Sequence, residues 1–158
     1  MGKVIQLKTL LQIRKRAKRD GNIVVFTNGC FDLLHRGHVE YLNKAKTLGD
    51  LLIVGINSDL SVRKIKGRGR PIIREEDRSF LLGSLESVDY VVIFNEITPL
   101  KLIERVRPDV LVKGGDYRKR EILGRETVQM SGGKVLTLPF VKGYSTRKLI
   151  KRIQRMRS

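Results

Sequence analysis

Cysteine, histidine and tryptophan are almost absent from this sequence, and their scarcity excludes several classes of protein. Among 158 residues there are one cysteine, Cys30, two histidines and no tryptophan. A single thiol excludes an intrachain disulfide framework, so we expect a protein of a reducing compartment, the cytoplasm. No apolar run approaches the roughly 20 residues of a membrane-spanning helix. We therefore expect no membrane partner.

Acidic residues are also scarce, since 16 Asp and Glu stand against 33 Lys and Arg, giving a formal net charge of +17. Such a charge favours anionic partners, nucleic acid among them. Aromatic residues make up only 6% of the chain, and none interleaves with basic clusters to form a base-stacking platform. We expect a solvated basic surface with a phosphate-binding site and no nucleic-acid partner. A basic nucleic-acid-binding module is the alternative from another class.

Short runs of Val, Ile and Leu alternate with amphipathic segments along most of the chain. Strands are predicted at 23–26, 51–56, 89–94, 109–112 and 134–138, and helices at 7–19, 39–48, 75–85, 98–106, 121–130 and from 145. This alternation predicts a doubly wound, Rossmann-like α/β fold with a five-stranded parallel sheet and helices on both faces. We expect one domain over 1–158, with an N-terminal helix in 1–21 and the α/β core in 22–158.

The stretch 27–38, TNGCFDLLHRGH, joins the first of these strands to a helix. Backbone N–H groups at a helix start are unpaired and lie at the positive end of the dipole, so they favour an anion. His35 and His38 share one face of that first turn, and imidazoles there are suited to stabilise developing phosphate charge. One cysteine and no further histidine are too few to complete a zinc site, so we assign no metal ligands.

Three other residues in this part of the chain each have a functional and a structural interpretation. Cys30 is either a nucleophile with a histidine base or, as we favour, a small buried filler. Asp32 either caps the following turn or orients a ligand group. Lys46 lies eight residues after His38 on roughly the same helix face, and it either reaches a phosphate or is solvated.

Polar and glycine-bearing segments follow the predicted strands at 28–38, 57–70 and 113–117, and another precedes Ser145. Ligands of doubly wound sheets bind beyond the carboxyl ends of the strands, so we expect these segments to converge there. The stretch 57–74 is too long and charged for a simple connector and is predicted to be a functional loop. Ser145 and Thr146 begin the last helix, either as a simple cap or as a second phosphate site.

Residues 28–32 (NGCFD) followed by 35–38 (HRGH) resemble the HxGH signature of the cytidylyltransferase-like nucleotidyltransferase superfamily. The resemblance continues through Lys46, 49–50, 66–67, 70–71, 76–78, 108–117, 138–140 and 143–146. The segments VKGGDY, GGKV, LPF and ST are similar to the adenylyltransferase domain of bifunctional heptose-phosphate kinase/adenylyltransferases. Arg147 departs from the pattern, which usually has a second threonine there.

This resemblance implies transfer of AMP from ATP to D-glycero-β-D-manno-heptose 1-phosphate, giving ADP-heptose and pyrophosphate for the lipopolysaccharide core. It also implies Mg²⁺ with the ATP, a homo-oligomer and a separate heptose-phosphate kinase. The alternative acceptors, with ATP or CTP, are glycerol 3-phosphate, ethanolamine phosphate and FMN. The implied catalytic residues are His35, His38 and Lys46. The implied nucleotide-binding residues are Asn28, Gly29, Cys30, Phe31, Asp32, Gly37, Lys113, Gly114, Asp116, Ser145 and Thr146, and the acceptor-binding candidates are Lys66, Arg70 and Arg78.

Overall fold

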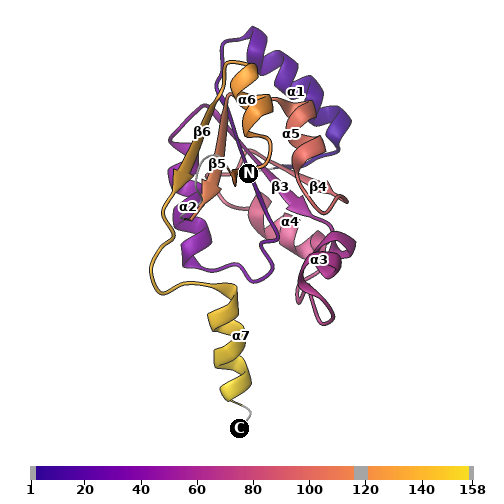
Figure 1. Ribbon diagram of the computed structural model, residues 1–158, viewed down its shortest axis with the longest axis vertical. Coiled ribbons are helices and arrows are strands. Elements are labelled where there is room, and N and C mark those ends of the chain that lie inside the picture. Colours follow the sequence, from indigo (N-terminus) through magenta and orange to yellow (C-terminus); the bar gives the residue numbers. More distant parts are fainter. Residues whose placement is uncertain (1–2, 116–120, 157–158) are drawn as a thin grey trace.

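A computed structural model describes residues 3–115 and 121–156 and shows alternating strands and helices around one parallel sheet (Figure 1). The elements in chain order are β1 (Lys3–Val4), α1 (Leu7–Arg19), β2 (Val24–Gly29), α2 (Arg36–Lys46), β3 (Leu51–Asn57), α3 (Asp59–Lys66), α4 (Glu75–Gly83), β4 (Tyr90–Phe94), α5 (Leu100–Val106), β5 (Val110–Gly114), α6 (Arg125–Met130), β6 (Lys134–Leu138) and α7 (Thr146–Arg155).

All described strand pairs are parallel, in the order β1-β4-β3-β2-β5-β6. The predicted doubly wound sheet is thus confirmed, with its five strands present as β2 to β6. The sixth strand, β1, was not predicted because two residues are too short to show an alternating pattern. The chain moves outward from β2 through β3 to β4, then returns to the other side of β2 with β5. The strand order therefore reverses between β2 and β5, which is where such sheets bind ligands.

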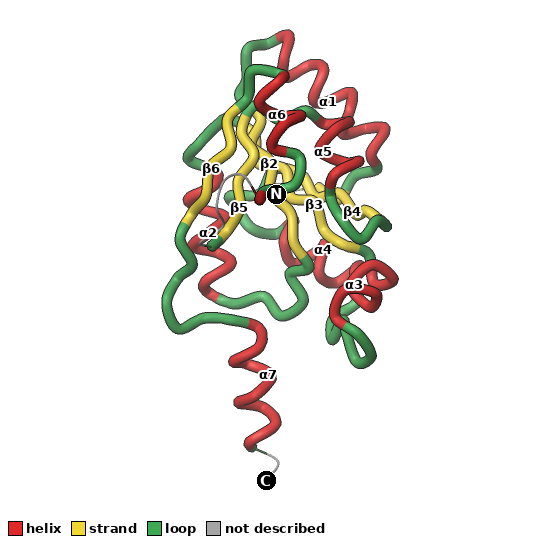
Figure 2. The backbone as a smooth tube through the Cα atoms, viewed as in Figure 1, coloured by secondary structure: helices red, strands yellow, loops and turns green. Residues whose placement is uncertain are grey.

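Two apolar clusters hold the helices against the two faces of the sheet. One includes Leu10 of α1, Ile103 of α5 and Val128 of α6, and the other includes Leu42 of α2 and Leu82 of α4. Figure 2 shows the yellow sheet between these red helices, whereas α7 extends away from the body beyond the carboxyl ends of the strands. None of the described helices has the length and apolar character needed to cross a lipid bilayer.

Carboxylates anchor the amino-terminal edge of the sheet. The backbone N–H of Val24 donates to Asp109 Oδ2 (2.8 Å), that of Ile23 to Asp50 Oδ2 (2.7 Å) and that of Leu52 to Asp89 (2.6 Å). These bonds satisfy strand-end donors that have no ladder partner. They also place three carboxylates at the edge opposite to the one where the strand order predicts a ligand.

Two predicted boundaries were wrong. The stretch 57–74 is not one loop, because its first half forms α3, which Ser58 caps by accepting the N–H of Ser61. Sequence reasoning missed this helix because its charged residues Arg63, Lys64 and Lys66 obscured the apolar positions. Helix α5 begins at Leu100, with Pro99 as its N-cap residue, and not at 98 as predicted.

Candidate active site

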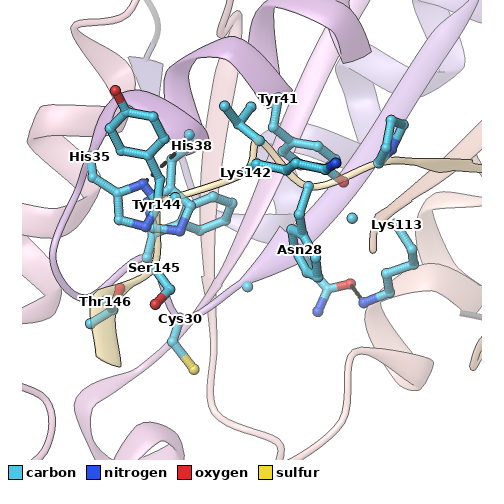
Figure 3. Close-up of a pocket in the computed structure, with 18 residues that line it drawn as sticks. Asn28, Cys30, His35, His38, Tyr41, Lys113, Lys142, Tyr144, Ser145 and Thr146 are labelled. Carbon is cyan, nitrogen blue, oxygen red and sulfur yellow. Dashed lines mark hydrogen bonds between the residues drawn. The ribbon is translucent and has the colours of Figure 1, made fainter. Parts of the chain in front are cut away.

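A cavity of about 670 Å³ opens at the point where the strand order reverses. Its walls come from four separate parts of the chain, as Figure 3 shows. They are the end of β2 with the following loop, the start of α2, the end of β5, and the segment that leads into α7. The lining residues are Asn28, Gly29, Cys30, Phe31, His35, Gly37, His38, Tyr41, Lys113, Gly114, Pro139, Phe140, Val141, Lys142, Gly143, Tyr144, Ser145 and Thr146.

The two histidines stand at the amino terminus of α2. His35 is the N-cap residue, and its Nδ1 accepts a long hydrogen bond from the backbone N–H of His38 (3.4 Å). The two rings stack with centroids 3.8 Å apart, and Phe31 packs edge-on against His38 at 5.1 Å. Phe31 itself has a left-handed backbone (φ 47°), a strained conformation that is concentrated at functional sites.

Gly37 allows the start of α2 to approach the segment before α7. A Cβ built at Gly37 would lie 2.9 Å from Cβ of Tyr144 and 3.1 Å from Nδ1 of His35. A side chain at this position would push apart the two segments that face each other across the cavity. This close approach explains why the HxGH pattern needs glycine at its third position.

Both imidazoles are neutral at pH 7. Burial lowers the pKa of His35, and burial together with the charge of His35 lowers the pKa of His38 to about 4. Nδ1 of His38 is buried and has no hydrogen-bond partner among the described residues. A buried polar atom without a hydrogen-bond partner lowers the stability of the fold, and such atoms are often found at functional sites. A lowered pKa makes an imidazole a weaker base. The histidines are therefore better suited to form hydrogen bonds with a ligand than to take a proton from it.

The depressed pKa of His38 makes stability depend on pH. Between about pH 4 and 6.5 the unfolded chain binds a proton at this position that the folded chain does not. The free energy of unfolding should therefore be highest above pH 6.5 and fall as the pH drops through that window. Urea unfolding at pH 5 and pH 7 measures this difference, which we expect to be smaller in His38→Asn. An equal difference in both proteins would contradict a buried neutral imidazole.

A lysine bridges the two strands at the reversal. Lys113 Nζ, from the end of β5, donates to Asn28 Oδ1 at the end of β2. Burial lowers the pKa of Lys113 to about 8, and the nearby Cys30 has a smaller effect that raises it. At pH 7 the ammonium is therefore mostly charged. It places a desolvated cation in the floor of the cavity.

The start of α7 forms the opposite wall. Ser145 is its N-cap residue and accepts the N–H of Lys148 at 3.1 Å, while Thr146 Oγ1 donates a long bond to Leu33 O at 3.4 Å. Two helix amino termini, those of α2 and α7, thus border one cavity. Of the four segments predicted to converge, 28–38, the described part of 113–117 and the stretch before Ser145 line the cavity, whereas 57–70 does not border it.

Lys46 is a correction to the sequence-based expectation. It does not border the cavity, because its Nζ bonds to Asp89 Oδ2 (2.6 Å) and to Asp50 O at the opposite edge of the sheet. Eight residues separate it from His38, a rise of about 12 Å along the helix axis. The shared helix face was therefore a poor guide to proximity. Lys46 thus lies at the amino-terminal edge, outside the cavity lining.

Asp32, Arg70 and Arg78 are also engaged elsewhere. Asp32 is buried and accepts the N–H groups of Ile72 and Ile73 together with Arg70 Nε (2.6 Å), and these bonds hold its pKa below the usual value despite burial. Arg78, with no exposed side-chain area, donates to Cys30 O, Ile73 O and Asp59. These predicted ligand-binding residues therefore form a buried junction behind the loop of residues 30–35, which we call the phosphate loop because it leads into the amino terminus of α2, a position that favours an anion.

Two other predicted residues lie away from the cavity or outside the described chain. Lys66 is exposed at the end of α3 and does not border the cavity. Asp116 lies outside the described residues. The sequence reasoning missed Tyr41, Phe140, Lys142 and Tyr144, all of which line the cavity. Tyr41 had a signal in its position, since it lies one helical turn beyond His38 on the same face, and Phe140 and Tyr144 lie in the segments 138–140 and 143–146 that carry the family resemblance.

Cys30 lines the cavity but is poorly suited to be a nucleophile. Burial is the main cause of the raised pKa of its thiol, opposed by Lys66, Arg78 and Arg70. Its Sγ lies 3.8 Å from Asn57 Oδ1. A protonated thiol without a strong base does not attack phosphorus. The thiol is half-buried and borders the cavity, so it is not the fully buried filler that was favoured.

The described lining of the cavity contains no carboxylate, and no group of three or more possible metal ligands occurs among the described His, Cys, Asp and Glu side chains. Two lysines and two helix amino termini instead make the cavity positive. Fold and site together define an α/β protein that binds a polyanion, of the nucleotide-phosphate type, at the reversal of a parallel sheet.

Comparison with known proteins identifies the family. The model of the cytidylyltransferase-like family matches residues 26–152, so the chain belongs to that family and is a nucleotidyltransferase. It is 54% identical over 152 residues to the bifunctional protein HldE of Geotalea uraniireducens and 52% identical over 153 residues to that of Helicobacter pylori strain Shi470. The two matches cover 96% and 97% of this chain, but only 31% and 32% of those relatives.

Solved structures agree with this assignment. The lipopolysaccharide core biosynthesis protein of Thermoplasma volcanium is 31% identical, with a TM-score of 0.63 over 79% of this chain and 100% of that chain. A pantoate-beta-alanine ligase from Francisella tularensis is 18% identical with a TM-score of 0.64, over 88% of this chain and 67% of that chain. The second likeness concerns the fold alone.

Proposed function

We propose that this chain transfers AMP from ATP to D-glycero-β-D-manno-heptose 1-phosphate, releasing pyrophosphate and giving ADP-heptose. The observation that carries the reaction type is a cavity with two helix amino termini, two histidines and a buried lysine, and with no carboxylate in its described lining. The acceptor is inferred from the relatives, since the adenylyltransferase domain of HldE makes ADP-heptose. The chain spans about a third of those relatives, so their remaining activities are not transferred to it.

The chemistry needs positioning and charge stabilisation and no enzyme nucleophile. An oxygen of the acceptor phosphate attacks the α-phosphorus as the bond from that phosphorus to the bridging oxygen breaks, and the bond electrons leave with pyrophosphate. A phosphate monoester dianion needs no base to become nucleophilic. This agrees with the neutral histidines and the protonated Cys30 thiol.

The residues take roles according to their positions. His35 and His38 donate hydrogen bonds to the transferring and leaving phosphates, where negative charge develops. Lys113 supplies a cation at the junction of β2 and β5, and Ser145 with the amino terminus of α7 binds the terminal phosphates. Tyr41, Phe140 and Tyr144 supply the apolar surface against which the nucleoside lies.

Mg²⁺ enters this proposal as part of the Mg·ATP substrate. Its preferred ligands are oxygens, carboxylates above all. The described lining offers Asn28, Ser145 and Thr146 oxygens and no carboxylate, which fits a metal that arrives on the triphosphate better than one held by the protein. In the same proposal, the reaction takes place in the cytoplasm, and a sugar kinase activity supplies the acceptor.

The decisive experiment measures pyrophosphate release with each pair of nucleotide and acceptor. ATP and CTP are combined with heptose 1-phosphate, glycerol 3-phosphate, ethanolamine phosphate and FMN. We expect turnover with ATP and heptose 1-phosphate at least about a hundredfold above every other pair, since a site that hydrogen-bonds its substrate discriminates strongly. Turnover with CTP and glycerol 3-phosphate, and none with heptose 1-phosphate, would refute the proposal.

A further inference from the structure

Helix α7 leaves an apolar stripe uncovered. None of its residues is buried, and Figure 1 shows the yellow helix extending from the body with no other element beside it. Its apolar residues recur at helical spacing and lie on one side, and they are Leu149, Ile150, Ile153 and, at the C-cap, Met156. Ile153 is 55% exposed and Met156 81%. A helix of 10 residues is marginal in water without tertiary packing.

The other side of α7 is strongly basic. Five cations and no acidic residue occur between positions 146 and 156, and they are Arg147, Lys148, Lys151, Arg152 and Arg155. A surface that covers the stripe must therefore combine apolar side chains with neighbouring carboxylates.

The outer face of α4 has this combination. Glu76, Asp77, Phe80 and Leu81 are exposed and lie on one side of the helix, opposite the buried Arg78 and Leu82. Phe80 is 67% exposed and Leu81 41%, although both are large and apolar. We call these four residues the acidic-apolar face of α4.

The α7 helix of the same chain does not lie against this face. Helix α4 packs on the sheet through Leu82 in the apolar cluster that also holds Leu42 of α2. Figures 1 and 2 show α7 directed away from the body, beyond the carboxyl ends of the strands. A second copy of the chain can supply the acidic-apolar face, and it can receive the same contact in return, which is the isologous arrangement of a two-fold dimer.

We propose that α7 docks on the acidic-apolar face of α4 of a second copy, twice in a symmetric dimer, and that this docking holds Ser145 and Thr146 in the cavity wall. The α7 wall of each cavity then depends on the second copy for its position. This wall is joined to the body by the long Thr146 bond to Leu33 and by Tyr144 in the turn before it, whose ring stacks on His35 with centroids 6.2 Å apart. The role in ATP binding rests on the proposed function, whereas the docking contact does not.

Sedimentation equilibrium of the full chain tests the docking with two matched pairs of variants. Ile153→Glu places a carboxylate in the apolar stripe, and Gln154→Glu adds the same charge beside it. Phe80→Glu changes the acidic-apolar face, and Met130→Glu makes the same kind of change at an 89% exposed residue of α6. We expect a dimer whose dissociation constant rises about tenfold or more in Ile153→Glu and Phe80→Glu, because both residues are central anchors. The two controls should match the unmodified chain.

The KM for ATP, measured in the same proteins by pyrophosphate release, tests whether the site depends on the docking. We expect KM to rise with the loss of dimer in Ile153→Glu and Phe80→Glu. A chain that stays monomeric, or a dimer unaffected by both variants, overturns the docking, as does a monomer whose α7 binds anionic vesicles instead. Weakened dimers with unchanged KM overturn the role in the site. Absence of turnover with every acceptor overturns the proposed function but not the docking, because the docking is tested by the molecular masses from sedimentation equilibrium.

Discussion

Replacing His38 by alanine should lower turnover by about a hundred- to a thousandfold, the effect of removing one donor to developing charge in a pre-formed site. His38 stacks on His35 at the start of α2 and lines the cavity, and its Nδ1 has no partner among the described residues. The neutral ring contributes a hydrogen bond and does not take up a proton. Pyrophosphate release under saturating ATP and heptose 1-phosphate measures the loss.

Lys46→Ala is the matched control for this result. Lys46 belongs to the same helix but bonds to Asp89 and Asp50 at the opposite edge of the sheet. The ion pair with Asp89 is partly exposed, so its loss should cost at most about 1 kcal/mol of stability and leave turnover within a few-fold. Thermal unfolding of both variants shows whether the fold is intact. Turnover that survives in His38→Ala but disappears in folded Lys46→Ala would reverse the assignment.

Replacing Arg78 by methionine should destabilise the chain by about 3–5 kcal/mol, because a buried guanidinium that donates three hydrogen bonds, one of them to the partly exposed Asp59, is lost. Its guanidinium donates to Cys30 O (2.6 Å), Ile73 O (3.0 Å) and Asp59 Oδ1 (2.7 Å). Methionine fills a similar volume but leaves these three acceptors without a donor. For a domain of this size the loss lowers the midpoint of thermal unfolding by roughly 10 °C.

Two further arginine variants sharpen that measurement. Arg74→Met removes an exposed guanidinium one helical turn earlier and should change stability by no more than about 0.5 kcal/mol. Arg78→Lys retains the charge but cannot reach all three acceptors, so its stability should fall between those of the unmodified chain and Arg78→Met. Equal midpoints of thermal unfolding for Arg78→Met and Arg74→Met would show that the junction behind the phosphate loop contributes little to stability.

The junction also bears on how the site is built. Asp32 and Arg78 come from opposite sides of the stretch 57–74, and each connects that stretch to the loop after β2. The charged stretch that suggested an acceptor-binding loop therefore supports the phosphate loop from behind. Lys66, the exposed acceptor-binding candidate in this stretch, is not part of the described cavity lining, and neither are the glycines of the stretch.

Local sequence patterns determined most of the fold and part of the site. The short β-branched runs were enough to place the five strands β2 to β6, because a strand buried on both faces must be apolar along its length. The pair His35 and His38 was also visible locally, since three residues span less than one helical turn. Ser145 could be placed at a helix start from capping chemistry alone, and the structure has it as the N-cap residue of α7.

Only the tertiary structure decided which partners the long polar side chains contact. Lys46 and Arg78 have the composition of ligand-binding residues, yet one anchors the far edge of the sheet and the other is buried in a junction. Thr146 in the cavity wall and its hydrogen-bond partner Leu33 are 113 residues apart in the chain, and the start of α7 meets that of α2 because the winding of the sheet returns it to the strand reversal. Hydrophobic periodicity records which residues leave water, whereas the partner of a polar group depends on distances that no local pattern contains.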